Sequence, residues 1–430
     1  MSLDPESVRA RFPSLHTGAG EKPRIYFDNP GGTQVADLVI DRTVRYFREN
    51  NANTHGTFET SRRSDALLQE AHESMAAFLN APSWREIIFG QNMTSLTFSI
   101  SRSIGRTLRE GDEIILTRMD HDGNVSPWLM LAEDCGARVV WLDFDPETSR
   151  YRMDMLPDLL SPRTRIVCVN HASNAIGTIN DVAAIGRMAH EAGALVYVDS
   201  VQYAPHAPID VQALGCDFLV CSAYKFFGPH QGILWGRREL LESLTPYKVR
   251  PADDELPVRF ETGTLSHEGI AGTLGAIEYL EWVGKTMGIG TETASAGTTG
   301  EAGGQADRTK TLHSGMRAIA VYEHALTLRL IRGVESIPGL RIYGLTGEDE
   351  MADRVPTVSF TSARHSPLAL SEALGEHGIF TWEGDYYAME VIARLGLAAS
   401  GGMLRTGLAH YNTAGEVDTF LNVLEQIQKH

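Results

Sequence analysis

The sequence predicts an α/β fold in which a mostly parallel sheet is covered by helices on both faces. Two observations support this prediction: short apolar runs such as residues 195–199 resemble buried strands, and segments with helical periodicity separate them. Strands this apolar need cover on both faces, and the intervening helices supply it. The 430 residues also exceed what one ordinary core accommodates, so we expect a second, smaller domain.

The predicted large domain runs from residue 25 to residue 285. Its first strand ends at the open loop Asn29-Pro-Gly-Gly32, and a helix follows. From residue 86 onward, apolar strands alternate with helices in the manner of a sheet of about seven strands. The predicted strands are 24–28, 86–90, 112–117, 138–142, 165–170, 195–199, 218–221 and 233–235, and the helices are 35–48, 64–79, 94–108, 127–135, 182–191 and 267–283.

The remaining residues, 1–24 and 286–430, are predicted to form the smaller domain. Residues 288–305 are almost entirely Gly, Thr, Ser, Ala and Glu, a composition without apolar anchors, so we expect a flexible insertion within 286–313. The pattern after it is that of an α+β domain. Its predicted helices are 314–332, 367–376 and 416–428, and its predicted strands are 340–343, 357–361 and 403–409.

Charge and cysteine usage exclude several classes of function. The formal net charge of −17 argues against a nucleic-acid or anionic membrane partner. No apolar run of about eighteen residues predicts a membrane span, and the N-terminus lacks the apolar segment of a signal peptide. The four cysteines form no C-x-x-C pair, so we expect no metal site, and buried thiols fit a cytoplasmic protein.

An acid and a lysine follow two of the predicted strands. Asp199 ends the run Leu195-Val-Tyr-Val, and Lys225 lies in Ser222-Ala-Tyr-Lys-Phe-Phe-Gly-Pro. The carboxyl ends of parallel strands meet at one edge of a sheet, where such folds bind ligands. A pyridoxal phosphate site requires this combination, a lysine for the aldehyde and an acid for the ring nitrogen. Taken singly, Lys225 could be a solvated charge and Asp199 a helix cap.

Further polar residues lie at neighbouring strand ends. Gln202, one turn beyond Asp199, and Asn174 could both donate a hydrogen bond to the phenolic oxygen of the cofactor. Thr94 stands between a strand and a helix, where backbone N–H groups and hydroxyls form a phosphate cradle. A simple N-cap formed by Thr94 or Ser95 explains the same pattern equally well. Ser222 would add another phosphate contact.

Two basic residues are candidates for direct roles in chemistry. His121 follows a strand end, where it could stack on a planar ring and transfer protons near neutral pH. Arg405 lies inside an apolar strand and therefore needs an anionic partner, either a structural acid or a substrate carboxylate.

Two other motifs are weaker. Ser222-Ala-Tyr-Lys225 satisfies the S-x-x-K pattern of serine acylases, but the companion motifs S-D-N and K-T-G are absent. Gly288-Ile-Gly290 resembles the start of a dinucleotide-binding loop, but it follows a helix and lacks the third glycine.

The chain resembles the class V aminotransferase family of fold-type I pyridoxal phosphate enzymes, in particular its branch of cysteine desulfurases and selenocysteine lyases. The resemblance covers nearly the whole chain, and its motifs occur in family order. They are Tyr26-Phe-Asp-Asn-Pro-Gly-Gly, Met93-Thr94, His121…Pro127-Trp128, Asn170-His-Ala-Ser-Asn-Ala-Ile-Gly-Thr, Val198-Asp199…Gln202, Tyr224-Lys225, Glu261-Thr-Gly-Thr264 and Arg405…Tyr411-Asn-Thr.

The resemblance implies a role for each matching residue. Lys225 would form the Schiff base, Asp199 would pair the ring nitrogen, and His121 would stack on the ring. Gln202 and Asn174 would reach the phenolic oxygen. The phosphate would lie among Met93, Thr94, Ser222 and Tyr224, where Tyr224 replaces a common histidine, and Gly263-Thr264 would reach it from the second subunit of a homodimer. The substrate, an amino acid, would meet Arg405, Asn29, His55 and Tyr387.

One departure from the family pattern concerns the reaction. Desulfurases of this branch carry a nucleophilic cysteine within Gly-His-His-Cys-Ala, whereas this chain has Glu383-Gly-Asp-Tyr-Tyr-Ala388, with Tyr387 at the cysteine's place. Tyrosine cannot accept sulfur as a persulfide. We therefore expect a β-elimination, by a C–S or related lyase, with an aminotransferase or an epimerase as the nearest alternative. A non-catalytic descendant and a serine acylase are more distant alternatives.

Overall fold

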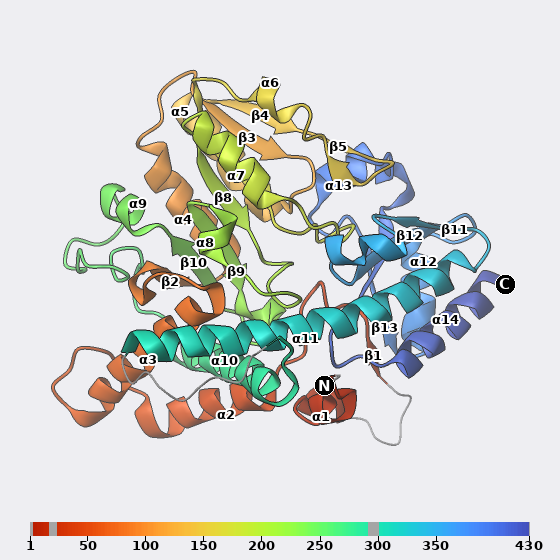
Figure 1. Ribbon diagram of the computed structural model, residues 1–430, viewed down its shortest axis with the longest axis horizontal. Coiled ribbons are helices and arrows are strands. Elements are labelled where there is room, and N and C mark those ends of the chain that lie inside the picture. The colour runs from red at the N-terminus through yellow and green to blue at the C-terminus, as the bar shows by residue number, and fades with distance from the viewer. Residues whose placement is uncertain (1–2, 17–23, 291–300, 430) are drawn as a thin grey trace.

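A seven-stranded sheet forms the centre of the computed structural model, which describes residues 3–16, 24–290 and 301–429 (Figure 1). Its strands are β2 (Ile87–Gly90), β3 (Glu113–Thr117), β4 (Arg138–Leu142), β7 (Thr164–Asn170), β8 (Leu195–Asp199), β9 (Phe218–Ser222) and β10 (Gly232–Gly236). Their order is β2-β10-β9-β8-β7-β3-β4. β10 is antiparallel to both of its neighbours, β2 and β9, and the other neighbouring pairs are parallel. The predicted mostly parallel sheet is confirmed, and each of these strands overlaps a predicted one.

Alternating side chains give the sheet two buried faces. Along β3, Ile114 and Leu116 join one hydrophobic core, whereas Ile115 joins the other. The first core contains residues of α4 (Met93–Gly105), α5 (Ser126–Cys135) and α9 (Arg238–Ser243). The second contains residues of α2 (Asp37–Arg45), α3 (Glu59–Leu79), α7 (Val182–Glu191) and α10 (His267–Met287). Helices thus cover both faces, as the apolar strands require.

The smaller domain is built on an antiparallel sheet. Its strand order is β11-β12-β15-β14, with β11 at Leu340–Tyr343, β12 at Thr357–Ser362, β15 at Met403–Gly407 and β14 at Trp382–Gly384. Val358, Phe360 and Leu404 of this sheet pack with α12 (Pro367–Glu376) and α14 (Ala414–Lys429) in a third core. The predicted α+β domain is confirmed, but the sequence did not indicate β14 or α13 (Met389–Arg394).

Two connections join the domains. Helix α11 (Glu301–Glu335) runs from beside α3 and α10 in the large domain to the small sheet and α14 (Figure 1). The short β1 (Ile25–Tyr26), which the sequence assigns to the large domain, pairs in parallel with β13 (Ile379–Phe380). Their joint packing fixes the two domains against each other across the sheet edge that binds ligands in this class of fold.

The predicted flexible insertion is only partly covered by the described residues. Residues 291–300 lie outside them. On the C-terminal side, α11 begins at Glu301, so residues 301–313 are helical rather than part of a loop. The prediction placed the start of this helix at residue 314, because Gly and Thr weaken the helical pattern before that point.

The remaining α-helices and strands of the described residues are short. They are α1 (Pro5–Arg9), α6 (Leu156–Leu159), α8 (Val211–Leu214), β5 (Phe144–Asp145) and β6 (Arg150–Tyr151). Within the described ranges, none of the helices combines the length and apolarity that crossing a bilayer requires. Nor do three His, Cys, Asp or Glu side chains gather there as metal ligands would.

Candidate active site

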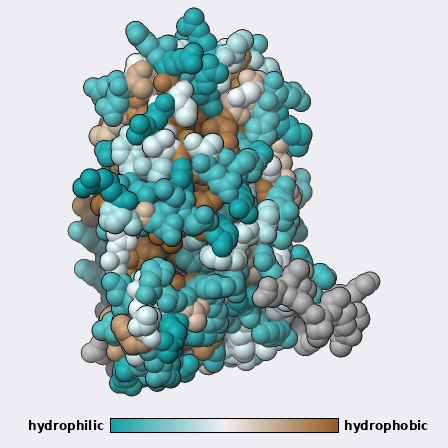
Figure 2. All heavy atoms as spheres, turned by 90° about the vertical axis from the view of Figure 1, so that its left-hand side faces the viewer, coloured by the Kyte–Doolittle hydropathy of each residue, from teal (hydrophilic) through white to brown (hydrophobic). Residues whose placement is uncertain are grey.

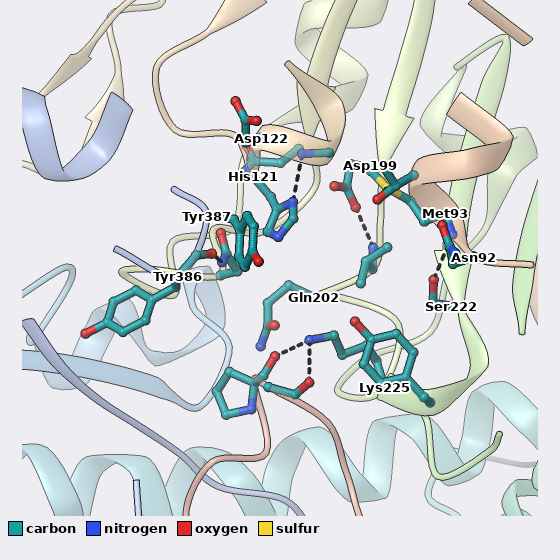
Figure 3. Close-up of a pocket in the computed structure, with 18 of the residues that line it drawn as sticks. Asn92, Met93, His121, Asp122, Asp199, Gln202, Ser222, Lys225, Tyr386 and Tyr387 are labelled. Atoms are coloured by element: carbon teal, nitrogen blue, oxygen red, sulfur yellow. Dashed lines mark hydrogen bonds between the residues drawn. The ribbon is translucent and has the colours of Figure 1, made fainter. Parts of the chain in front are cut away.

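A cavity of about 550 Å³ lies where the carboxyl ends of β7, β8 and β9 meet the small domain (Figure 3). Most of the predicted site residues line it, and these come from both domains. They are Met93, Thr94, His121, Asn174, Asp199, Gln202, Ser222, Tyr224, Lys225, Tyr387 and Arg405. The structure therefore brings together residues that are more than 300 positions apart in the sequence, as the convergence of strand ends predicts.

Lys225 is buried at the bottom of this cavity. Its side chain follows β9, and Nζ donates hydrogen bonds to the backbone oxygens of Pro30 and, at 3.1 Å, Gly31. Burial, assisted by the positive charge of Arg405, lowers the pKa of Lys225 to about 7, although Asp28 raises it. A substantial fraction of the amine is then neutral near pH 7, as a nucleophile or base must be.

Asp199 is the last residue of β8, the strand that pairs with β9. It is 5% exposed, and one carboxylate oxygen accepts a hydrogen bond from the backbone N–H of Val201 at 2.9 Å. Burial raises the pKa of Asp199 to about 6, while Lys225 lowers it. Among the described residues it forms no ion pair within bonding distance. A buried carboxylate in this state requires a cation, and a protonated ring nitrogen would supply one.

His121 is held in one orientation by the backbone that follows it. Its Nδ1 accepts a hydrogen bond from the N–H of Gly123 at 2.9 Å, which places the proton of the neutral ring on Nε2. Burial, together with Lys225 and Arg405, lowers the pKa of His121 to about 4. The imidazole is therefore neutral at pH 7. Its ring stacks on Tyr387 with centroids 5.5 Å apart.

The start of α4 lines another side of the cavity. Asn92 caps the helix by accepting a hydrogen bond from the N–H of Ser95 at 2.9 Å, and the N–H of Met93 donates to Ser222 at 3.3 Å. Among the described residues, the only hydrogen-bond partner of the Thr94 hydroxyl is the sulfur of Met93, at 3.8 Å. A helix N-terminus flanked by two hydroxyls is suited to bind an anion.

Glycine at 232 allows α4 to begin at this place. A Cβ atom at Gly232 would overlap the backbone of Asn92, with Cα at 2.7 Å. The close approach of β10 to the cap therefore depends on the absence of a side chain. It also positions the N-terminus of α4 next to Ser222, because Gly232 pairs with Ser222 across β10 and β9.

Three buried polar atoms at the cavity have no hydrogen-bond partner among the described residues. They are Oδ1 of Asn174, Oε1 of Gln202 and Nε of Arg405. Buried polar groups are normally paired, so three unpaired atoms around one cavity indicate a polar ligand. Both amide oxygens can only accept, and the amide nitrogens are already used: Nδ2 of Asn174 donates to the backbone oxygen of Tyr386 at 2.9 Å and Nε2 of Gln202 donates to the Thr357 hydroxyl at 3.0 Å. The predicted donation from these amides to the phenolic oxygen is therefore not available in this arrangement. A phenolic hydroxyl of pyridoxal phosphate could instead donate to one of the two amide oxygens, and Nε of Arg405 could donate to a substrate carboxylate. The residues present therefore fit this cofactor.

Arg405 has a structural acid as a partner, one of the two alternatives that its place in an apolar strand predicts. Its Nη2 lies 3.0 Å from the carboxylate of Asp28, Nη1 donates to the backbone oxygen of Asn174 at 3.2 Å, and the guanidinium lies over the ring of Tyr386. Asp28 thus holds one end of the guanidinium while Nε remains unpaired. The arrangement leaves an edge of Arg405 for a carboxylate and fixes its direction.

The predicted contact of Asn29 with substrate is corrected by the structure. Asn29 does not line the cavity; its Nδ2 donates to Gly407 and Asn412 at 2.7 and 3.0 Å, and its Oδ1 accepts from Tyr411. These bonds occupy the amide and fix the loop of Pro30 against β15. Asn29 therefore positions the loop rather than the substrate.

Three other predicted site residues lie outside this cavity in the same chain. His55, Gly263 and Thr264 line a separate hollow of about 820 Å³. The His55 side chain is 80% exposed, with Nδ1 3.6 Å from Asp65. Within one chain they contribute nothing to the surroundings of Lys225, so their predicted roles require a second copy of the chain.

The chain's cysteines all lie within the described residues, and none of them lines the cavity. Cys168, Cys216 and Cys221 are buried, and burial raises the pKa of each thiol. Ser222 and Lys225 likewise form no hydrogen bond with each other, since Lys225 donates to the loop after Asp28. The serine-acylase alternative therefore lacks its activated nucleophile.

A family model described as aminotransferase class-V matches residues 25–296 and 294–420. The chain belongs to the class V aminotransferase family. This family consists of pyridoxal phosphate-dependent enzymes, in agreement with the unpaired groups around the cavity. The resemblance found in the sequence motifs is confirmed.

Curated relatives of this class V enzyme include cysteine desulfurases. One, from Synechococcus elongatus, is 32% identical over the whole of this chain, which spans only 64% of that protein. Another, from Klebsiella pneumoniae, is 32% identical, with 100% of this chain and 99% of that protein aligned. The structure of a cysteine desulfurase from Thermococcus onnurineus matches along both full chains, with a TM-score of 0.85 and 26% identity. The fold-type I architecture is thereby confirmed.

Proposed function

We propose that this class V enzyme uses pyridoxal phosphate to catalyse β-elimination from an amino acid, without a persulfide-forming cysteine. One observation carries the proposal: Lys225 and Asp199 converge on a cavity that none of the four cysteines lines. Tyr387, which the motif resemblance aligns with the cysteine of desulfurases, lines this cavity instead. The three unpaired polar atoms support the presence of both a cofactor and a carboxylate.

Lys225, Asp199, His121 and the start of α4 would hold the cofactor. Asp199 would neutralise the protonated ring nitrogen, His121 would stack on the ring, and the phosphate would lie between Met93, Thr94 and Ser222. Bound in this way, pyridoxal phosphate supplies an electron-withdrawing ring that stabilises negative charge at the substrate Cα.

Arg405 would bind the substrate, and Lys225 would transfer its proton. Nε of Arg405 binds the α-carboxylate, which orients the Cα–H bond toward Lys225. Lys225 Nζ, with its pKa lowered to about 7, takes the Cα proton and passes it to the group that leaves Cβ. The Cα–H and Cβ–X bonds break, HX departs, and reaction of the remaining fragment with water yields pyruvate and ammonia.

A homodimer is the assembly that we propose. The hollow around His55, Gly263 and Thr264 is bordered by exposed apolar residues, among them Val249, and Phe58 is exposed nearby. Figure 2 shows the side of the molecule with α9 and the start of α3, where apolar side chains lie between hydrophilic ones. A second copy at this hollow would let Gly263-Thr264 reach the partner's phosphate. We propose a cytoplasmic location, on the basis of buried thiols and acidic composition.

An aminotransferase or an epimerase is the second candidate, because removal of the Cα proton by Lys225 is common to all three reactions. Transamination or epimerisation would be favoured by a second side chain placed to move a proton on the substrate. Among the described residues of the cavity, we assign no side chain to this role. Tyr386 donates its hydroxyl to the backbone of Met403, so it is not available for proton transfer.

The first test is spectroscopic. After mixing with pyridoxal phosphate and gel filtration, the protein should retain an absorption band at the short-wavelength end of the visible range. Lys225→Ala should abolish both this band and all turnover. Lys285→Ala, which removes an exposed lysine of α10, is the control and should keep both. A colourless wild-type protein, or a band that survives in Lys225→Ala, would refute the assigned site.

A further inference from the structure

Two exposed aromatic side chains line the cavity that contains Arg405. Trp382 in β14 pairs directly with Arg405 in β15, so their side chains stand next to each other on one face of the sheet. Both line the cavity, yet Trp382 is 55% exposed. A large aromatic ring beside a substrate-binding arginine is thus left in water in this chain.

Tyr387 supplies the second ring. It is 70% exposed and lines the same cavity, stacked on His121; in Figure 3 it stands on one side of His121 with Asp199 on the other. The phenol has no hydrogen-bond partner among the described residues, unlike that of Tyr386. Its exposed surface is therefore an apolar wall of the cavity mouth rather than part of a polar network.

The backbone holds Tyr387 in place at a cost in free energy. Tyr386 and Tyr387 both have left-handed φ angles, 55° and 57°, which non-glycine residues rarely adopt. Three hydrogen bonds keep this conformation: Asp122 N–H to Tyr387 O at 2.6 Å, Asn174 Nδ2 to Tyr386 O at 2.9 Å, and Tyr387 N–H to Asp385 at 3.0 Å. Strain that is fixed in this way occurs mainly at ligand-binding sites.

Two acidic side chains that line the cavity near these rings already have hydrogen-bond partners. Asp122, whose N–H binds Tyr387, accepts a hydrogen bond from the Ser126 hydroxyl at 2.7 Å. Asp28 is paired with Arg405. The mouth therefore offers one edge of an arginine for a carboxylate and two aromatic surfaces for whatever extends beyond Cβ.

From this juxtaposition we infer that the substrate is an amino acid with a bulky aromatic group on its β-substituent, of the S-aryl-cysteine class. With the carboxylate on Arg405, the aromatic group lies between Trp382 and Tyr387 and removes both rings from water. Free cysteine would leave both rings exposed. This inference rests on the proposed function. For S-phenyl-L-cysteine, the elimination is S-phenyl-L-cysteine plus water giving thiophenol, pyruvate and ammonia, with no oxidant or reductant.

The kinetic test compares two substrates in one set of variants. The ratio of kcat/KM for S-phenyl-L-cysteine to that for S-methyl-L-cysteine should exceed one in the wild type. It should fall about tenfold in Trp382→Ala and in Tyr387→Ala, roughly the contribution of one aromatic contact. Trp382→Phe should recover most of the ratio. Leu368→Ala, at an exposed apolar residue of α12 outside the cavity, should leave it at the wild-type value. An unchanged ratio in both alanine variants would overturn the inference.

A binding test separates this inference from the proposed reaction. The cofactor-loaded protein is titrated in a calorimeter with 3-(phenylthio)propanoate and with propanoate, neither of which has an amino group to react. The phenylthio compound should bind at least tenfold more tightly, and Trp382→Ala should remove the preference. Equal affinities would refute the aromatic slot even if elimination occurs. A retained preference without turnover of any amino acid would instead refute the proposed function and leave the slot standing.

Discussion

Burial shifts the pKa values of Lys225 and Asp199 in opposite directions. Burial lowers the pKa of the lysine to about 7 and raises that of the acid to about 6. The mutual attraction of these groups opposes both shifts but does not cancel them. The site is therefore tuned for a lysine that is partly neutral and an acid that binds a cation near neutral pH.

The shifted pKa of Lys225 predicts how stability depends on pH. The unfolded chain binds this proton up to a pKa near 10.4, whereas the folded chain releases it near 7, so the unfolded state holds more protons between these values. The free energy of unfolding of the cofactor-free protein should therefore rise between pH 7 and 10, with a contribution of up to about 1.4 kcal/mol per pH unit from this group. Urea denaturation of wild type and Lys225→Met measures it; a Lys225→Met profile as steep as the wild type would contradict the buried lysine.

Arg405 provides a second prediction at this scale. Replacement by lysine keeps the charge but loses the planar edge that binds a carboxylate while Asp28 holds the other end. Arg405→Lys should lower kcat/KM by about 100-fold, mostly through KM, because roughly 2–3 kcal/mol of charge-assisted hydrogen bonding is lost. Arg341→Lys, on β11 outside the cavity, is the matched control and should have no effect.

At the scale of elements, the site depends on where strands and helices end. The strand ends that carry Asp199 and Lys225 were predictable, because apolar runs stop at polar residues and parallel strands align their carboxyl ends. The pairing of Asp28 with Arg405 and the bonds of Asn29 to Tyr411 and Asn412 were not, since their partners lie more than 370 residues away. Nor does a sequence reveal two consecutive left-handed tyrosines.

The close approach of β10 to the start of α4 gives an element-scale prediction. Gly232→Ala places a methyl group against the backbone of Asn92 and should push the N-terminus of α4 away from Ser222. Affinity for pyridoxal phosphate should fall about tenfold or more, because the anion-binding end of the helix is displaced. Gly375→Ala, where an added Cβ meets nothing within 4 Å, should leave this affinity unchanged in the same titration. Equal affinities in the two variants would show that the cradle tolerates displacement.

At the scale of the whole molecule, two domains and a proposed second subunit complete the site. The seven-stranded sheet, the smaller domain and most of the cavity were predictable from periodicity and motif order. A single chain does not place His55, Gly263 and Thr264 near a cofactor, because they line a separate hollow. Their predicted contacts with a cofactor require the second subunit of the proposed homodimer.

The proposed homodimer predicts an effect of Thr264 at a distance. Light scattering should give twice the chain mass, and Thr264→Asp should weaken binding of pyridoxal phosphate about tenfold by placing a negative charge near the partner's phosphate. Thr286→Asp, an exposed position of α10, is the control for added charge. A monomer, or a Thr264→Asp variant with wild-type affinity, would place the phosphate site entirely within one chain.

The most direct test of the account is the product formed from L-cysteine by the cofactor-loaded enzyme. Elimination without a persulfide-forming cysteine predicts sulfide, pyruvate and ammonia in equal amounts. The mass of the intact protein, measured by mass spectrometry, should show no added sulfur. Alanine as the product, together with a protein that has gained sulfur, would contradict the proposed role of the Tyr387 loop.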